Sequence, residues 1–209
     1  KIQHTSGNHA ISFDNIQFTN NTKKDHLADV STCSSAEDVN RLTIINCLFY
    51  ETETARPDDQ AQRSVVAICA AAEGGRTGTQ LVFKNNIVKT IDYDTKNENA
   101  YYNVAITTSG IYSNKSYGDN IYNYAMHEIE GNQFLGHFHS IIAGGYANVV
   151  NNVFDGKYYN RETVAVTSRA FQFRGTVGYE TGTQFNMTVV NNTFKNLGQI
   201  FKLYTDDRM

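Results

Sequence analysis

The sequence is short of several residue types, and each shortage excludes a class of protein. Tryptophan is absent, proline occurs once, and cysteine occurs three times among 209 residues. Three cysteines cannot all pair within one chain, and the spacing of Cys33, Cys47 and Cys69 matches no zinc-binding pattern. The formal net charge of −3 provides no basic field for nucleic acid. No apolar run reaches the ~18 residues of a membrane span, and no secretory signal is visible. We therefore expect no metal site, no nucleic-acid partner and no membrane span in this chain.

The most informative feature that is present is a short phrase repeated six times. It consists of an apolar–x–apolar run, an Asn or Gly-Asn step, and an apolar residue that is usually Phe. Apolar residues that alternate with period two indicate a β-strand with one inward and one outward face. The steps lie 20 to 46 residues apart, so a constant unit carries insertions of variable length, which is typical of a solenoid. The copies are Ile11–Phe18, Leu42–Phe49, Leu81–Val88, His127–Phe134, Ala147–Phe154 and Met187–Phe194.

A second strand-like run follows each copy, and no stretch shows a sustained helical period. The two runs, joined by a bend at the Asn step, make one coil. The sequence therefore predicts an all-β solenoid of about six coils with loop insertions, folded as a single domain over residues 1–209. The second runs are Ala28–Thr32, Val66–Ala70, Val104–Thr108, Ser140–Gly144, Val164–Ser168 and Gln199–Leu203.

The residue at each step is expected to form the bend between two strands. Asn and Gly tolerate the left-handed backbone region better than other residues, and Gly131 takes the place of Asn in the fourth copy. When coils stack, amides at equivalent positions can bond to one another, as in other stacked parallel strands. The alternative is that the steps are turns between antiparallel strands. The asparagines expected in this inner ladder are Asn15, Asn46, Asn85, Asn151 and Asn191.

The coil length, the Asn steps and the inward Ile, Val and Phe columns resemble the right-handed parallel β-helix of the pectin-lyase-like superfamily. The resemblance covers residues 11–203. This superfamily includes polysaccharide lyases, pectin-degrading hydrolases, uronan epimerases, phage tail spikes and surface adhesins, so the resemblance implies a fold more strongly than an activity. The phrase Val-Val-Asn-Asn-Thr-Phe-Lys-Asn, residues 189–196, is similar to repeats of large microbial adhesin-like proteins.

Neither end of the sequence shows a polar cap of the kind that terminal repeats need, so we expect a fragment of a longer chain. Cys47 stands in a column that Asn fills in other copies. Two interpretations of the cysteines stay open: small residues packed in stacked columns, or a bridge between Cys33 and Cys69 on adjacent coils.

Candidate site residues concentrate in the fifth coil, because function on a rigid column gathers in inserted loops and the outward residues beside them. Tyr158 and Tyr159 offer flat apolar faces with polar tips that suit sugar stacking. The carbohydrate-binding candidates are Lys157, Tyr158, Tyr159 and Arg169. Should the chain be a lyase, the catalytic candidates are His139, Arg161, Arg169 and Arg174.

Two functions follow from these residues. Elimination from a uronic polysaccharide needs a base, an acid and a cation or metal on the carboxylate, which the lyase candidates could provide, with Ca²⁺ as an optional cofactor. Hydrolysis would need two carboxylates, for which Asp155 and Glu162 are the nearest pair in this coil. The catalytic motifs of pectin hydrolases and lyases are missing. We therefore expect a non-catalytic extracellular module of an adhesin or structural surface protein, without cofactor, that binds a polysaccharide or a cell-surface protein; a polysaccharide lyase is the alternative.

Overall fold

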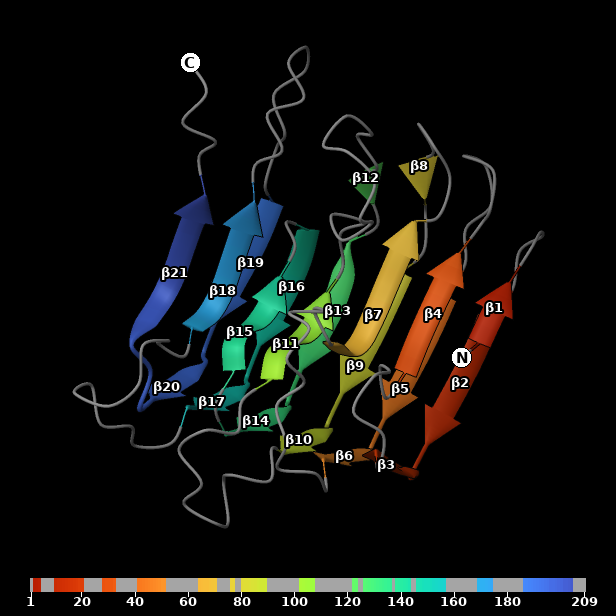
Figure 1. The fold of residues 1–209 in the computed structure, drawn as a ribbon, viewed down its shortest axis with the longest axis horizontal. Coiled ribbons are helices and arrows are strands. Elements are labelled where there is room, and N and C mark those ends of the chain that lie inside the picture. The colour runs from red at the N-terminus through yellow and green to blue at the C-terminus, as the bar shows by residue number, and fades with distance from the viewer. Residues whose placement is uncertain are drawn as a thin grey trace, which may run out of the picture.

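The structure is a computed structural model in which β-strands stack into layers (Figure 1). The residues that it describes, to which every structural statement below is confined, are 2–4, 10–20, 28–32, 41–51, 64–70, 76–77, 80–89, 102–107, 122–123, 126–136, 138–143, 146–156, 169–174 and 186–204.

The strands belong to three large parallel sheets and one small one. Sheet 1 contains β2 (Ala10–Asp14), β5 (Arg41–Ile45), β9 (Gln80–Lys84), β13 (His127–Glu130), β16 (Tyr146–Val150) and β19 (Asn186–Val190). Sheet 2 contains β3 (Gln17–Asn20), β6 (Leu48–Glu51), β10 (Ile87–Lys89), β14 (Gln133–Leu135), β17 (Val153–Asp155) and β20 (Thr193–Lys195). Sheet 3 contains β1 (Ile2–His4), β4 (Ala28–Thr32), β7 (Ser64–Ala70), β11 (Tyr102–Thr107), β15 (Phe138–Ala143), β18 (Arg169–Arg174) and β21 (Gln199–Tyr204). The small sheet pairs β8 (Arg76–Thr77) with β12 (Tyr122–Asn123).

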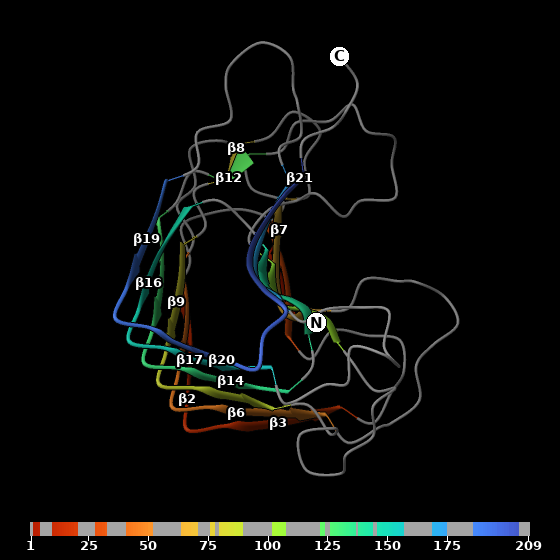
Figure 2. The same cartoon turned by 90° about the vertical axis from the view of Figure 1, so that its left-hand side faces the viewer.

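The chain passes through the three large sheets in a fixed order, for example β2, β3, β4 and then β5. We call one such passage a winding and number the windings by the six copies of the repeat. Figure 2 shows sheets 1 and 3 facing each other, with sheet 2 leaving the edge of sheet 1 at an angle. Parallel pairing on every large sheet is consistent with a β-solenoid, and the antiparallel-turn alternative is wrong for the described residues.

The predicted second runs are partly misplaced. The fifth strand of this set is β18, Arg169–Arg174, whereas the sequence pattern predicted Val164–Ser168, which lies outside the described residues. The pattern also aligned Val104 with Val66, but the structure pairs Ile106 with Val66. Both Val104 and Ile106 are apolar and two residues apart, so the alternation is equally satisfied by either register. The prediction of the other runs agrees with β4, β7, β15 and β21 to within a few residues.

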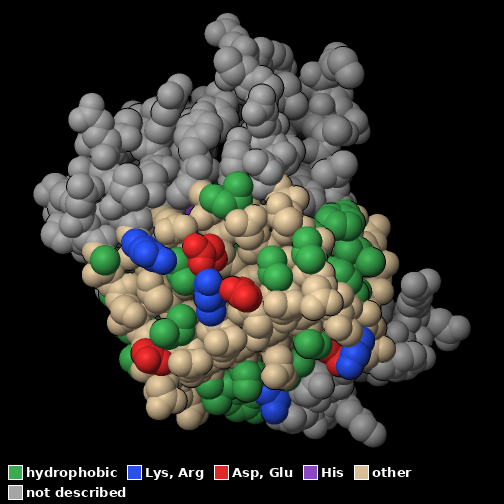
Figure 3. Space-filling view, turned by 180° about the vertical axis from the view of Figure 1, so that it is seen from behind, with side chains coloured by type: hydrophobic (Ala, Val, Ile, Leu, Met, Phe, Trp, Pro, Cys, Tyr) green, Lys and Arg blue, Asp and Glu red, His purple; other side chains and the backbone are tan. Residues whose placement is uncertain are grey.

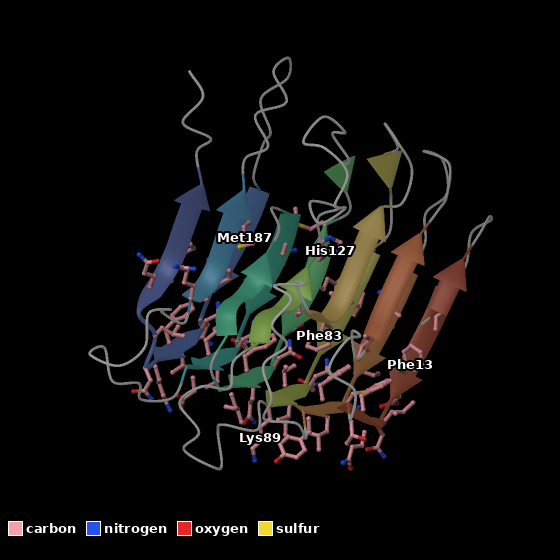
Figure 4. The ribbon with its side chains drawn as sticks, in the orientation of Figure 1. Phe13, Phe83, Lys89, His127 and Met187 are labelled. Atoms are coloured by element: carbon pink, nitrogen blue, oxygen red, sulfur yellow. The ribbon has the colours of Figure 1, made fainter. Side chains whose placement is uncertain are left out.

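The interior contains columns of apolar side chains that extend from winding to winding. Phe134 stacks on Phe154 and Phe154 on Phe194, each with ring centroids 5.1 Å apart. The predicted inward position of the Phe after each step is thereby confirmed. The strand pairing aligns equivalent residues of successive windings, such as Phe134 and Phe154, so their side chains contact each other directly. Figure 4 shows Phe13 and Phe83 on this inner side, whereas Lys89 lies outside.

The left-handed bend is confirmed at every step. Asn15, Asn46, Asn85, Asn151 and Asn191 have φ between 54° and 58°, and Gly131 has φ of 67°. A side chain at position 131 would also collide with Oδ1 of Asn85. The Gly therefore satisfies both the backbone conformation and the space left by its neighbour.

The predicted inner ladder lies one residue further along the chain than expected. The bend asparagines themselves are exposed, and the ladder is made by the residue after each bend, which is buried in the second to fifth windings. Asn132, for example, accepts a hydrogen bond from Asn86 N–H through Oδ1 (2.8 Å) and donates to the Phe83 carbonyl (2.8 Å). The ladder positions from the first winding to the sixth are Ile16, Cys47, Asn86, Asn132, Asn152 and Asn192.

Candidate functional site

The corner between sheets 2 and 3 in the fifth winding is the region to which the sequence assigned the candidate residues. Arg169 is the first residue of β18 and Arg174 its last, and His139 lies in β15, the neighbouring strand of the fourth winding. Because Ile142 pairs with Phe171, His139 and Arg169 differ by one position along the two strands. The structure therefore places His139 near Arg169 on sheet 3 but not at the same register position, which Ser140 occupies. The other candidates, Lys157, Tyr158, Tyr159 and Arg161, lie outside the described residues.

Arg169 is buried, with 8 % of its surface exposed. It shares the face of β18 with Phe171, which packs between Phe154 and Phe201 in the core. Its Nε donates a hydrogen bond to Oε1 of Gln199 in the sixth winding (2.8 Å). Its Nη1 is buried and has no hydrogen-bond partner among the described residues. Guanidinium groups donate strong hydrogen bonds to carboxylates and other anions, and this Nη1 has such a bond left to donate.

The backbone of the fifth winding is tightly constrained where sheet 2 ends. Gly156 follows β17, and a side chain there would lie 2.5 Å from the carbonyl oxygen of Asn196 in the next winding. Asn196 has φ of 53° and donates from Nδ2 to Oδ1 of Asp155 (2.8 Å). Asp155 is therefore hydrogen-bonded to Asn196. Glu162, the carboxylate with which the sequence paired Asp155, lies outside the described residues.

A second group of charges lies on the outer face of sheet 1. Lys84 Nζ is 2.7 Å from Oε2 of Glu128 and 3.1 Å from Oε2 of Glu130. Hydrogen bonds to Glu128 and to Glu130 raise the pKa of Lys84 above its usual value. In Figure 3, which views this face, adjoining acidic and basic side chains stand among polar and hydrophobic ones. The pair Glu128 and Glu130 was visible in the sequence as an acidic doublet, but its neutralisation by Lys84 depends on the pairing of β9 with β13.

Two further residues were not identified from sequence. Lys89 Nζ lies 5.7 Å from the ring centroid of Tyr50 on the neighbouring strand of sheet 2, within the range of a cation–π interaction. Lys89 and Tyr50 lie the same number of residues after the bend Asn of their repeats, and this shared spacing could have predicted their contact from the sequence. This pairing occupies one face of the Tyr50 ring, so that ring is a weaker sugar-stacking surface than its exposure alone would suggest.

His127 is the most deeply buried titratable side chain of the described residues, with 1 % exposure. Its Nδ1 accepts a hydrogen bond from Leu81 N–H (2.9 Å), which requires a neutral ring with the proton on Nε2. Burial lowers the pKa of His127 to about 4. Figure 4 places it on the inner side of the strands, as Met187 is, so it belongs to the core rather than to an open site.

Of the cysteines, only Cys47 has a described side chain, which is buried and not in a disulfide. It occupies the ladder position in the second winding, which confirms the prediction that it replaces Asn there. Cys69 lies in β7, where its backbone pairs with Ser31, and Cys33 lies outside the described residues. A bridge between Cys33 and Cys69 therefore stays a prediction.

No family model, no curated protein and no solved structure matches this chain. Within the described ranges, His, Cys, Asp and Glu form no group of three that could hold a metal ion. In the same ranges no helix has the length and hydropathy needed to cross a bilayer.

Proposed function

We propose that this chain is a non-catalytic extracellular module, a right-handed parallel β-helix of about six coils with pectin-lyase-like architecture. It serves in a cell-surface adhesin or another structural surface protein. The observation that carries this proposal is the continuous stack of amides and phenyl rings along the axis. From the second winding to the sixth, each winding bonds to the next through Asn side chains, such as Asn132 to Asn152. Repeated contacts of this kind make a stiff column, which suits a load-bearing surface element.

The charges on the outer face of sheet 1 support a non-catalytic role. A general base works best when its pKa lies near the operating pH. The two carboxylates around Lys84 instead raise its pKa and keep the ammonium protonated. The three side chains carry a net charge of −1 and hold one another in place, which is the behaviour of a structural ion cluster.

Carbohydrate is the proposed ligand, or else a protein on a cell surface, with Lys157, Tyr158, Tyr159 and Arg169 as the contact residues. Arg169 is the one residue of this set that the structure describes, and its Nη1 has no hydrogen-bond partner among the described residues. The same observation favours the second candidate function, a uronan lyase in which Arg161, Arg169, Arg174 and His139 act on an acidic sugar, with Ca²⁺ as an optional cofactor. A glycoside hydrolase is the weaker form of this alternative.

The two functions are separated by incubating the protein with pectate, alginate and chondroitin, with and without Ca²⁺. The absorbance of unsaturated uronate measures elimination, and retention on the immobilised polysaccharides measures binding. We expect retention without product, and weaker retention for the Tyr158→Ala and Tyr159→Ala variants, with Asn148→Ala as the exposed control. Sustained product formation that disappears in Arg169→Ala or Arg174→Ala would instead establish the lyase. Protease accessibility on intact source cells checks the surface location.

A further inference from the structure

The sequence contains four triplets of the form Asn-x-Thr or Asn-x-Ser in which x is not proline. In exported proteins such a triplet is the acceptor for an N-linked oligosaccharide, which is bulky and needs a position at the surface. The triplets begin at Asn20, Asn114, Asn186 and Asn191. Of these four asparagines, the structure describes the side chain of Asn191, which lies at the bend of the sixth winding.

Asn191 lies at the surface, although the sequence pattern placed it in the inner ladder. It has φ of 54°, and its side chain is exposed. The following residue, Asn192, makes the ladder bond instead, because its Oδ1 accepts the hydrogen bond from Asn152 N–H (2.8 Å). A ladder residue such as Asn152, with 1 % exposure, has no space for a sugar. The one-residue shift of the ladder therefore makes Asn191 an accessible acceptor.

The exposure of Asn191 is a property of the corner between sheets 1 and 2 and does not depend on which winding follows. The bend residues Asn46, Asn85 and Asn151 each have a described winding before them and another after them. All three are exposed as Asn191 is. A further winding stacked on the sixth in the same way would therefore leave the Asn191 side chain in solvent.

The amide nitrogen of Asn191 has a hydrogen that a sugar can replace. Nδ2 of Asn191 donates a hydrogen bond to Oδ1 of Asn151, the bend residue of the fifth winding (2.6 Å). A side-chain amide carries two N–H donors, and this bond uses one of them. The amide can therefore carry a sugar on Nδ2 and keep the bend conformation, which depends on the backbone and on the ladder residue that follows.

The hydroxyl residue of the triplet is not required by the repeat. Thr193 begins β20 and is exposed on the outer face of sheet 2. Its hydrogen bond to the Asn152 carbonyl is made by the backbone N–H (2.8 Å), which every residue except proline provides. A hydroxyl residue two positions after the bend therefore occurs only where it completes a triplet. The counterparts of Thr193 in the first five windings are Gln17, Leu48, Ile87, Gln133 and Val153.

We propose that Asn191 is the attachment site of an N-linked oligosaccharide. In the transfer, Nδ2 of Asn191 forms a bond to the anomeric carbon of the first sugar and loses one proton. The bond from that carbon to the phosphate oxygen of a lipid-pyrophosphate-linked donor breaks, and the lipid pyrophosphate leaves with the electron pair. This inference rests on the extracellular location in the proposed function, because oligosaccharide is transferred to exported chains.

The test begins with the protein isolated from the surface of its source cells and digested with trypsin. The peptide of residues 175–195 contains both Asn186 and Asn191. Fragmentation by electron transfer leaves a sugar on its residue, so mass spectrometry distinguishes these two positions. We expect an oligosaccharide mass on Asn191. Surface protein in which Asn191 is entirely unmodified would overturn this inference alone, whereas absence of the protein from the surface would reject the proposed function as well.

Three variants of the full chain, expressed in the source cells, separate the triplet from its surroundings. Thr193→Val removes the hydroxyl and keeps a branched side chain, and Asn191→Gly removes the acceptor and keeps a residue that tolerates positive φ, as Gly131 does. Both should lose the oligosaccharide at position 191 completely. Thr19→Val is the matched control, because Thr19 is exposed on the same sheet and belongs to no triplet. An oligosaccharide that persists on Asn191 in Thr193→Val, or is lost in Thr19→Val, would contradict the proposal.

Discussion

Oδ1 of Asn152 accepts two hydrogen bonds from the preceding winding, from the backbone N–H and from Nδ2 of Asn132, both at 2.9 Å. Asn152 in turn donates from Nδ2 to the Ile129 carbonyl (2.9 Å). One buried amide therefore satisfies a backbone donor and a backbone acceptor that the tight bend leaves out of the sheet ladders. The bend between sheets 1 and 2 depends on this amide, because unpaired buried polar groups are costly.

Replacing Asn132 by Ala should destabilise the protein by about 3 kcal/mol, because Asn86 N–H and the Phe83 carbonyl lose their buried partner. Urea unfolding followed by circular dichroism measures the change. Asn148→Ala is the matched control, since Asn148 is exposed on the outside of sheet 1 and should alter stability by no more than about 0.5 kcal/mol. Equal effects of the two substitutions would mean that the ladder contributes nothing specific.

Cys47→Asn should extend the amide ladder by one step. The Cys47 thiol now contacts the carbonyls of Phe13 (3.8 Å) and Ile45 (3.1 Å) as a weak donor. An Asn there can donate to the Phe13 carbonyl as Asn86 does to the Ile44 carbonyl, so we expect a gain of about 1 kcal/mol in unfolding free energy. Cys47→Ala is the control and should lose stability. A loss in both variants would show that the second winding lacks space for the amide.

Phe154→Ala should cost about 3–5 kcal/mol, because its ring is fully buried and packs against Phe134, Phe171 and Phe194. Phe194→Ala, which removes the same side chain from a half-buried site, should cost clearly less. Thermal and urea unfolding of both variants check this order. If the two substitutions had equal cost, the sixth winding would be covered in solution.

Stability should fall in mild acid because of His127. Its pKa is about 4 in the folded protein, below the ordinary value of 6.5, so the unfolded chain binds a proton more readily. Its stabilising contribution is complete above pH ~6.5 and is lost as the pH falls towards ~4, by about 3 kcal/mol in total. Urea midpoints measured across this interval test the effect.

His127→Asn provides the control for that pH dependence. Its amide oxygen can accept the hydrogen bond from Leu81 N–H but does not titrate in this range. We expect the variant to show a flatter dependence of stability on pH between 4 and 6.5. A wild-type slope that persists in His127→Asn would assign the acid sensitivity to other groups.

The alternation of apolar residues and the recurring step were sufficient to predict parallel stacked strands, inward phenyl rings and left-handed bends at Asn46, Asn85 and Asn151. These features are local, since period two follows from strand geometry and positive φ is tolerated by few residue types. The ladder was misplaced by one residue because both residues of an Asn-Asn step are amides. Which of Asn151 and Asn152 points inward depends on the turn of the backbone at the bend.

The sequence predicted the candidate site less well than it predicted the fold. Arg169 was chosen as an outward, exposed side chain, whereas β18 begins at this residue and places it on the inner face beside Phe171. Whether Arg169 points inward depends on the register of β18 against β15 and β21. The long insertion before β18 leaves that register unspecified by the sequence. The pairing of Lys84 with Glu128 and Glu130 likewise required neighbours 44 and 46 positions apart to be brought side by side.

The amino-acid order alone determined that short strands would alternate with tight left-handed bends, because these choices depend on each residue's own stereochemistry and polarity. The three-dimensional packing decided which amides are buried and that His127 lies neutral in the core. Those properties arise from contacts between windings, and such contacts exist only once segments 20 to 46 residues apart are stacked in register.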